Sequence, residues 1–111
     1  MTRPSRPRRG EVWLVGLDPT VGPEIRKTRP RVVISPPEIN DHPRTVTVAP
    51  MTTASRPAPF RIAVTFRHRT GLILLDQIRT LDKIRLVRHL GAITRQTLDA
   101  TLATLREMFE M

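Results

Sequence analysis

The segment GEVWLVGLDPTVGPEIRKTRPRVVISP, residues 10–36, decides the fold of this chain. It predicts a strand at residues 12–17 that is apolar on both faces, and a β-branched second strand at residues 31–35. Asp18-Pro19 and Gly22-Pro23 mark a long loop between them. Charged side chains accompany the segment: Glu11, Asp18, Glu24, Arg26, Lys27, Arg29 and Arg31. Because the two strands hold the charged loop in place, we expect binding or chemistry there.

The rest of the chain predicts more short strands and one helix. β-branched or apolar runs predict strands at residues 45–49, 61–66, 72–78 and 86–92, turns at 67–71 and 80–83, and a long loop at 50–59. The last element differs, because apolar residues recur there at helical spacing. Its N-cap is Thr94, and its apolar face is Leu98, Leu102, Leu105 and Phe109.

Five or six strands followed by one helix, without βαβ alternation, predict an α+β fold that is mainly β. We expect a small, strongly bent antiparallel sheet or barrel with the C-terminal amphipathic helix packed on it. The length of 111 residues indicates one domain. We place this domain at residues 10–111, after a basic flexible arm at residues 1–9.

The composition favours a polyanionic partner. Lys and Arg number 19 against 10 acids, for a net charge of +9. Such a charge attracts nucleic acid or an acidic protein, and charge alone does not choose between them. The scarcity of aromatic residues argues against a base-stacking sheet. There is no cysteine, which fits a reducing cytoplasm, and no signal peptide or membrane span is predicted.

Several kinds of chemistry are not predicted. His42, His68 and His89 lack metal-ligand spacing, and the acids are spread through the chain rather than clustered. No nucleophile elbow, phosphate-binding Walker loop or dinucleotide motif is present. The sequence therefore predicts no metal and no cofactor.

Arginines and hydroxyls remain, and they suit work on phosphate. In metal-free RNA cleavage the substrate supplies its own 2′-OH nucleophile, and the protein must stabilise the growing charge. Arg29, placed where the loop re-enters the sheet, offers a guanidinium fork for two phosphate oxygens. Thr52 and Thr53 open the second long loop. The alternatives are structural: Arg29 bonding loop carbonyls, the threonines capping turns, and Glu24 pairing with nearby basic residues.

Two blocks of the sequence resemble the MazF/PemK toxins. Residues 10–36 match that family's opening strand, its DPT-x-G-x-E loop and its RP motif. The later block LILLDQIRTLDKIRL, residues 72–86, is similar to a block ending in Q-x-R-T-[ILV]-D. The resemblance runs from Gly10 to the C-terminus and keeps the two motifs in order.

This resemblance implies a sequence-specific endoribonuclease acting as the toxin of a toxin–antitoxin module. Members cut single-stranded RNA without metal and leave a 2′,3′-cyclic phosphate. The implied fold is a small SH3-like barrel that forms a homodimer, with RNA along the dimer interface. The implied partner protein is an antitoxin with an acidic flexible tail that occupies the same surface.

The family's functional positions transfer to individual residues of this chain. The implied catalytic residues are Arg29 and Thr52, with Glu24 as base or RNA contact. The implied RNA contacts are Lys27, Thr20, Thr53, Asp76 and Gln77. The chain has Pro23 and Leu74 where the PemK branch carries a histidine and an arginine, so the MazF-type pair is favoured.

Two other functions stay open at this point. A CcdB-like toxin shares the barrel and poisons DNA gyrase by protein binding, without needing an arginine and a threonine at one phosphate. A passive RNA-binding module would bind RNA in a salt-dependent manner and cut nothing.

Overall fold

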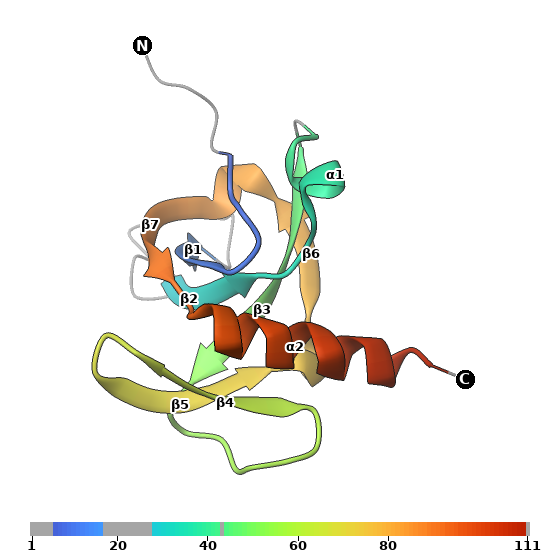
Figure 1. Ribbon diagram of the computed structural model, residues 1–111. Coiled ribbons are helices and arrows are strands. Elements are labelled where there is room, and N and C mark those ends of the chain that lie inside the picture. Colours follow the sequence, from blue (N-terminus) through green and yellow to red (C-terminus); the bar gives the residue numbers. More distant parts are fainter. Residues whose placement is uncertain (1–5, 17–27, 43, 111) are drawn as a thin grey trace.

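The structure, a computed structural model, describes residues 6–16, 28–42 and 44–110 (Figure 1). The strands are β1 (Glu11–Gly16), β2 (Thr28–Val33), β3 (Thr45–Thr52), β4 (Arg61–Phe66), β5 (Arg69–Leu74), β6 (Arg79–Asp82) and β7 (Leu86–Ala92). The helices are α1 (Pro37–Asn40) and α2 (Arg95–Met108), and short 3₁₀ turns lie at Leu75–Gln77 and Lys83–Arg85.

All strand pairs are antiparallel, and β3 is the centre of the fold. The strand order is β4-β5-β3-β2-β1-β7, and β6 pairs with β3 as well. The first half of β3 pairs with β6, whereas its end, at Met51 and Thr52, pairs with β5. One long strand therefore serves two parts of the sheet, and the sheet curls around it (Figure 1). This confirms the predicted mainly β, strongly bent antiparallel fold with a C-terminal helix.

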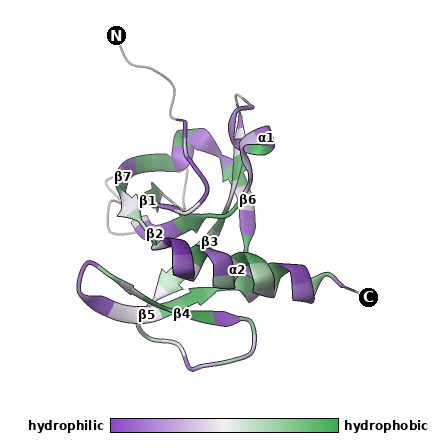
Figure 2. Cartoon of the chain, in the orientation of Figure 1, coloured by the Kyte–Doolittle hydropathy of each residue, from purple (hydrophilic) through white to green (hydrophobic). Residues whose placement is uncertain are grey.

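The central strands bury both of their faces. On one face, Val12 of β1 and Val32 of β2 belong to an apolar cluster against which Leu98 and Leu105 of α2 pack. On the other face, Val15 and Val33 belong to a second cluster, completed by Val46, Val48, Leu81 and Leu86. Figure 2 shows the hydrophobic residues concentrated on the strands that lie against α2. The two clusters explain why the first predicted strand is apolar on both faces.

Helix α2 begins as predicted and ends one residue early. The Thr94 hydroxyl accepts a hydrogen bond from the backbone N–H of Thr97 at 3.1 Å, so Thr94 is the N-cap. Leu98 and Leu105 face the core, but Phe109 is 72% exposed. The prediction that Phe109 completes the apolar face is wrong, because the helix ends at Met108 and Phe109, its C-cap residue, is exposed.

The region between β4 and β7 differs from the prediction. The turn before β5 is only Arg67 and His68, both in the left-handed region with φ of 50° and 66°, so β5 starts at Arg69. Strand β5 ends at Leu74, and a 3₁₀ turn follows it. This turn leads the chain from β5, which pairs with the end of β3, to β6, which pairs with the first half of β3. The predicted turn at residues 80–83 is mostly strand β6, which has one inward apolar residue, Leu81, and therefore almost no alternation signal.

Part of the predicted flexible arm is attached to the barrel. Pro7 is buried, and the Arg8 backbone is hydrogen bonded to Glu11 in both directions, at 2.8 and 3.0 Å. The Arg9 Nε donates to the carbonyl oxygen of Ile34 at 2.9 Å. These contacts tie residues 7–9 to the start of β1.

Candidate functional site

The register of β2 on β3 sets the geometry of the site. Arg31 pairs with Pro50 and Val33 pairs with Val48 in this antiparallel ladder. Residues two apart on a strand share a face. Arg29 lies two residues before Arg31 on β2 and therefore shares the face of Arg31 and Val33. Thr52 lies two residues after Pro50 on β3, just past the end of this ladder, where β3 pairs with β5.

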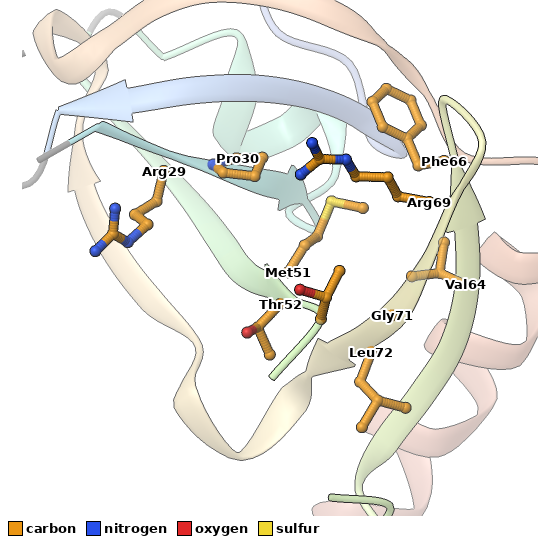
Figure 3. A pocket seen from close by; sticks show the side chains of 10 residues that line it. Arg29, Pro30, Met51, Thr52, Val64, Phe66, Arg69, Gly71 and Leu72 are labelled. Carbon is orange, nitrogen blue, oxygen red and sulfur yellow. The ribbon is translucent and has the colours of Figure 1, made fainter. Parts of the chain in front are cut away.

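Arg29 and Thr52 both line a pocket of about 390 Å³. Figure 3 shows Arg29 on one side and Arg69 on the other, with Met51 and Thr52 between them. The other lining residues are Pro30, Thr53, Val64, Phe66, Gly71 and Leu72. Two guanidinium groups and two hydroxyls thus border a largely apolar floor, an arrangement suited to a phosphate ester carrying a flat ring.

A second pocket, of about 370 Å³, adjoins the first. Arg29, Met51 and Thr52 line both pockets, and the second adds Arg31, Pro50, Gln77 and Arg79. None of its described lining residues is acidic. The two pockets form one cationic groove in which Arg29 and Thr52 occupy the middle.

Arg31 is the most buried charged residue among those described. Its side chain comes from the inward face of β2, and the residue is 8% exposed. Burial, and then the neighbouring Arg79 and Arg29, lowers the pKa of the Arg31 guanidinium. Its Nε has no hydrogen-bond partner among the described groups. The groove therefore concentrates positive charge at its inner wall.

The two threonines differ in position from the prediction. Thr52 is the last residue of β3 rather than the first of the loop, and Thr53 follows it as an exposed residue. The Thr52 hydroxyl accepts a hydrogen bond from the Ala54 backbone N–H at 3.1 Å, as a turn-capping threonine does. This bond uses an acceptor lone pair, so the hydroxyl proton remains available to a phosphate oxygen.

Asp76 is engaged in a bidentate pair with Arg61. The distances are 3.1 Å from Nη2 to Oδ2 and 3.4 Å from Nε to Oδ1, and Arg61 Nη1 also donates to the Arg56 carbonyl oxygen at 3.2 Å. Asp76 therefore helps hold the long loop before β4. Its predicted RNA contact stays a prediction, whereas Gln77 lies in the second pocket beside Arg31 and Arg79.

The Arg61–Asp76 pair predicts an acid-dependent loss of stability. The hydrogen bond from Arg61 lowers the pKa of Asp76, so the folded value lies below the unfolded one. The stabilisation is then complete above the unfolded value of about 4 and is lost as the pH falls through the folded value. We expect Asp76→Asn to lower the Tm at pH 6 by the equivalent of about 1 kcal/mol or less, because the pair is partly exposed.

Thermal melts between pH 3 and pH 7 check this prediction. The Tm difference between wild type and Asp76→Asn should shrink toward zero at the acid end. Asp41→Asn, at an exposed position, is the control for removing one surface carboxylate. A difference for Asp76→Asn that stays constant down to pH 3 would contradict the role assigned to the pair.

The opening GEVW motif is structural in this fold. The Glu11 Oε1 accepts from the Trp13 Nε1 at 3.0 Å and from the Arg8 backbone N–H at 2.8 Å. His89 of β7 lies 3.5 Å from the other Glu11 oxygen and 5.2 Å, ring to ring, from Trp13. These contacts fasten the start of the domain to β1 and β7.

Three predicted site residues, Thr20, Glu24 and Lys27, lie outside the described residues. Within the described ranges, the structure brings Arg29, Thr52, Thr53 and Gln77 to the groove. No group of three or more histidine, aspartate and glutamate side chains with metal-site geometry occurs in that part of the chain. None of the described helices is long and apolar enough to cross a membrane.

Sequence reasoning missed three residues of the groove: Arg31, Arg69 and Arg79. Arg31 was predicted only as one member of a basic cluster. The alternation along β2 carried the missing signal, because Arg29 and Arg31 share the face of the buried Val33. Arg69 begins β5, whose first residues fall within the predicted turn at residues 67–71. Arg79 begins β6, most of which falls within the predicted turn at residues 80–83.

The curled β fold thus brings arginines and threonines to one groove, an arrangement suited to phosphate groups. Residues 8–109 match the family described as PemK-like, MazF-like toxin of type II toxin-antitoxin system, and the chain belongs to this family. This confirms the resemblance read from residues 10–36 and 72–86.

Individual relatives support the same family assignment. The endoribonuclease PemK of Escherichia coli is 39% identical over 85 residues, covering 72% of this chain and 64% of PemK, slightly less than two thirds of its length. The endoribonuclease MazF9 of Mycobacterium tuberculosis is 33% identical over 115 residues, covering 94% of this chain and 93% of the relative. A solved mycobacterial endoribonuclease in complex with its cognate antitoxin has a TM-score of 0.74 at 28% identity, covering 91% and 92% of the two chains.

Proposed function

We propose that this chain is a sequence-specific, metal-independent endoribonuclease that cuts single-stranded RNA as the toxin of a toxin–antitoxin module. The observation that carries the proposal is that Arg29 and Thr52 both line the two adjoining pockets of a cationic groove. Membership of the PemK-like, MazF-like family and relatives named endoribonucleases support it.

The proposed reaction is an in-line transfer within the RNA. The 2′-oxygen attacks the adjacent phosphorus, the bond from phosphorus to the 5′-oxygen breaks, and the products are a 2′,3′-cyclic phosphate and a 5′-hydroxyl. Arg29 holds the phosphate and neutralises the charge that develops on it, and it donates a hydrogen bond to the leaving 5′-oxygen, which takes up a proton from water. Thr52 donates a second hydrogen bond to the phosphate. Preorganised donors of this kind are each worth about 10²–10³ in rate.

The proton of the 2′-OH needs an acceptor. An arginine does not serve well, because its guanidinium stays protonated in proteins. Glu24 is proposed as this base, with water as the alternative acceptor. The further proposed RNA contacts are Thr20, Lys27, Thr53, Asp76 and Gln77.

The proposed partners follow from the family. We propose a homodimer with RNA along its interface and an antitoxin whose acidic flexible tail occupies the groove, where the net charge of +9 favours it. A solved relative is described as an endoribonuclease in complex with its cognate antitoxin. The proposed compartment is the cytoplasm.

The test is incubation of the pure protein with long single-stranded RNA in excess chelator. We expect cleavage at a short recurring sequence, with cyclic-phosphate ends and with 5′-hydroxyl ends that polynucleotide kinase labels without prior phosphatase treatment. Uncut RNA, or cleavage only after a metal is added, would contradict the proposal. The CcdB-like alternative predicts instead that the protein stalls gyrase and leaves RNA intact, and the relatives named endoribonucleases do not favour it.

A further inference from the structure

Arg31 is a buried cation without a described counter-charge. It is 8% exposed, and its Nε lies buried with no hydrogen-bond partner among the described groups. Among the described acidic side chains, Asp76 pairs with Arg61, Asp99 pairs with Arg95, and Glu11 lies 3.5 Å from His89, and none of these three acids lines the second pocket. Buried charges in proteins are normally paired, because leaving water is costly. The positive charge of Arg31 therefore needs a counter-ion other than the described residues.

The neighbours of Arg31 raise the cost rather than lower it. Arg79 lies across β3 from it, and Arg29 lies two residues earlier on the same strand face. Both disfavour the charged form of Arg31, as the lowered pKa of its guanidinium reflects. Three guanidinium groups line one pocket of about 370 Å³ that has no described acidic wall. Such a pocket is built to receive an anion.

We propose that the pocket of Arg31 and Arg79 binds a second phosphate of the RNA, adjacent to the phosphate held at Arg29 and Thr52. The proposal rests on the proposed function, since the second phosphate is defined by its place next to the cleaved one. Residues i and i+2 of a strand are about 6.6–6.8 Å apart. That spacing is comparable to the spacing of neighbouring phosphates along an extended single strand.

The fork of Arg31 suits this ligand. A guanidinium binds two phosphate oxygens at once through two parallel N–H donors. Because Arg29, Met51 and Thr52 line both pockets, a strand of RNA passes from one pocket to the next without leaving the groove. Arg31 is thus a positioning residue, which fixes the register of the RNA while Arg29 and Thr52 act on the reacting phosphate.

The first test measures stability and binding on the same variants. In Arg31→Met an unbranched apolar side chain replaces the buried charge, so we expect the Tm of the free protein to rise. Binding to a randomised, 2′-O-methylated 12-nucleotide pool, which cannot be cleaved, should weaken about 10–100-fold, as for loss of a hydrogen bond to a charged group. Arg31→Lys, which keeps the charge but loses the fork, should lie between Arg31→Met and wild type. The control is Arg106→Gln, which removes one exposed charge on α2 and should change binding about twofold or less.

A structural arginine gives the opposite pattern. The proposal would be overturned if Arg31→Met and Arg31→Gln both had a lower Tm than wild type and bound RNA as well as Arg106→Gln does. So would weakened binding to a polyglutamate peptide with RNA binding unchanged, because the pocket would then serve an acidic peptide. Cleavage by the wild type is scored separately. If wild type binds the pool through Arg31 yet cuts no RNA, the proposed function fails and the phosphate pocket stands.

The second test locates the phosphate. Starting from a sequence that wild type cleaves, single methylphosphonates, which are neutral, replace the phosphate on either side of the cleaved one. At one of these two positions, we expect the methylphosphonate to weaken binding to wild type about tenfold. The same methylphosphonate should weaken binding to Arg31→Gln very little, because this variant no longer holds that phosphate. Equal losses in wild type and Arg31→Gln at both positions would overturn the proposal, even if Arg29 proves essential for cleavage.

Discussion

Arg29→Ala is expected to lower the rate of RNA cleavage about 10²–10³-fold while leaving the fold intact. Arg29 is exposed at the mouth of the groove, and substitutions at exposed positions usually change stability by less than about 0.5 kcal/mol. The loss should appear in kcat, because the guanidinium matters most when charge builds on the phosphate. Single-turnover cleavage of a mapped RNA site, together with a thermal melt, measures both effects.

Two companion variants sharpen this result. Arg29→Lys keeps the charge but not the fork, so it should retain a small part of the activity. Arg106→Ala, on the exposed side of α2, should cut RNA at nearly the wild-type rate. If Arg29→Ala kept more than about a tenth of the wild-type rate with an unchanged Tm, Arg29 would not be the phosphate-holding group.

Gly71→Ala is expected to damage both stability and activity. A Cβ built at Gly71 lies 2.4 Å from the carbonyl oxygen of Thr52 and 3.1 Å from its carbon, so β3 and β5 would have to separate. Overpacking of this kind costs about 1–3 kcal/mol. For a domain of this size that corresponds to a Tm lower by roughly 5–20 °C. Because Thr52 itself must move, cleavage should fall by about 10²-fold even where the protein is still folded.

The matched control is Gly16→Ala, in strand β1. There the added Cβ meets Val87 and the Arg85 carbonyl at 3.8 and 4.0 Å, which are ordinary contacts. This variant should melt and cleave much like wild type. Measuring cleavage well below the Tm of Gly71→Ala separates displacement of Thr52 from unfolding. Wild-type cleavage by Gly71→Ala at that temperature would mean that Thr52 does not act on the phosphate.

The outline of the fold was predictable because its signals are local. Strands at residues 61–66 and 86–92 match β4 and β7 in their bounds, and Thr94 caps α2 as its position before the apolar periodicity indicates. The strand that the sequence does not predict, β6, has only four residues, and its pairing partner β3 lies far from it in the sequence. Its strand character comes from its partner rather than from its own sequence.

The site was predictable in part for a similar reason. The motif containing Arg29 and the position of Thr52 pointed to the groove, and both residues line it. The contribution of Arg31 was not predictable, because its neighbourhood depends on β2 and β6 both pairing with β3. Asp76 is the opposite case. Its motif predicts an RNA contact, whereas in the structure its carboxylate forms an ion pair with Arg61.

The pairing of Arg31 with Pro50 has a consequence for how this protein tolerates change. Arg29 and Thr52 come to one groove because the β2–β3 ladder just before them aligns the two strands residue by residue. Exchanging side chains elsewhere on β2 and β3 leaves that alignment in place. A single inserted or deleted residue inside either strand turns every side chain beyond it to the opposite face. Length variation, in engineered libraries or among related genes, therefore belongs in the loop of residues 54–60 and not within these two strands.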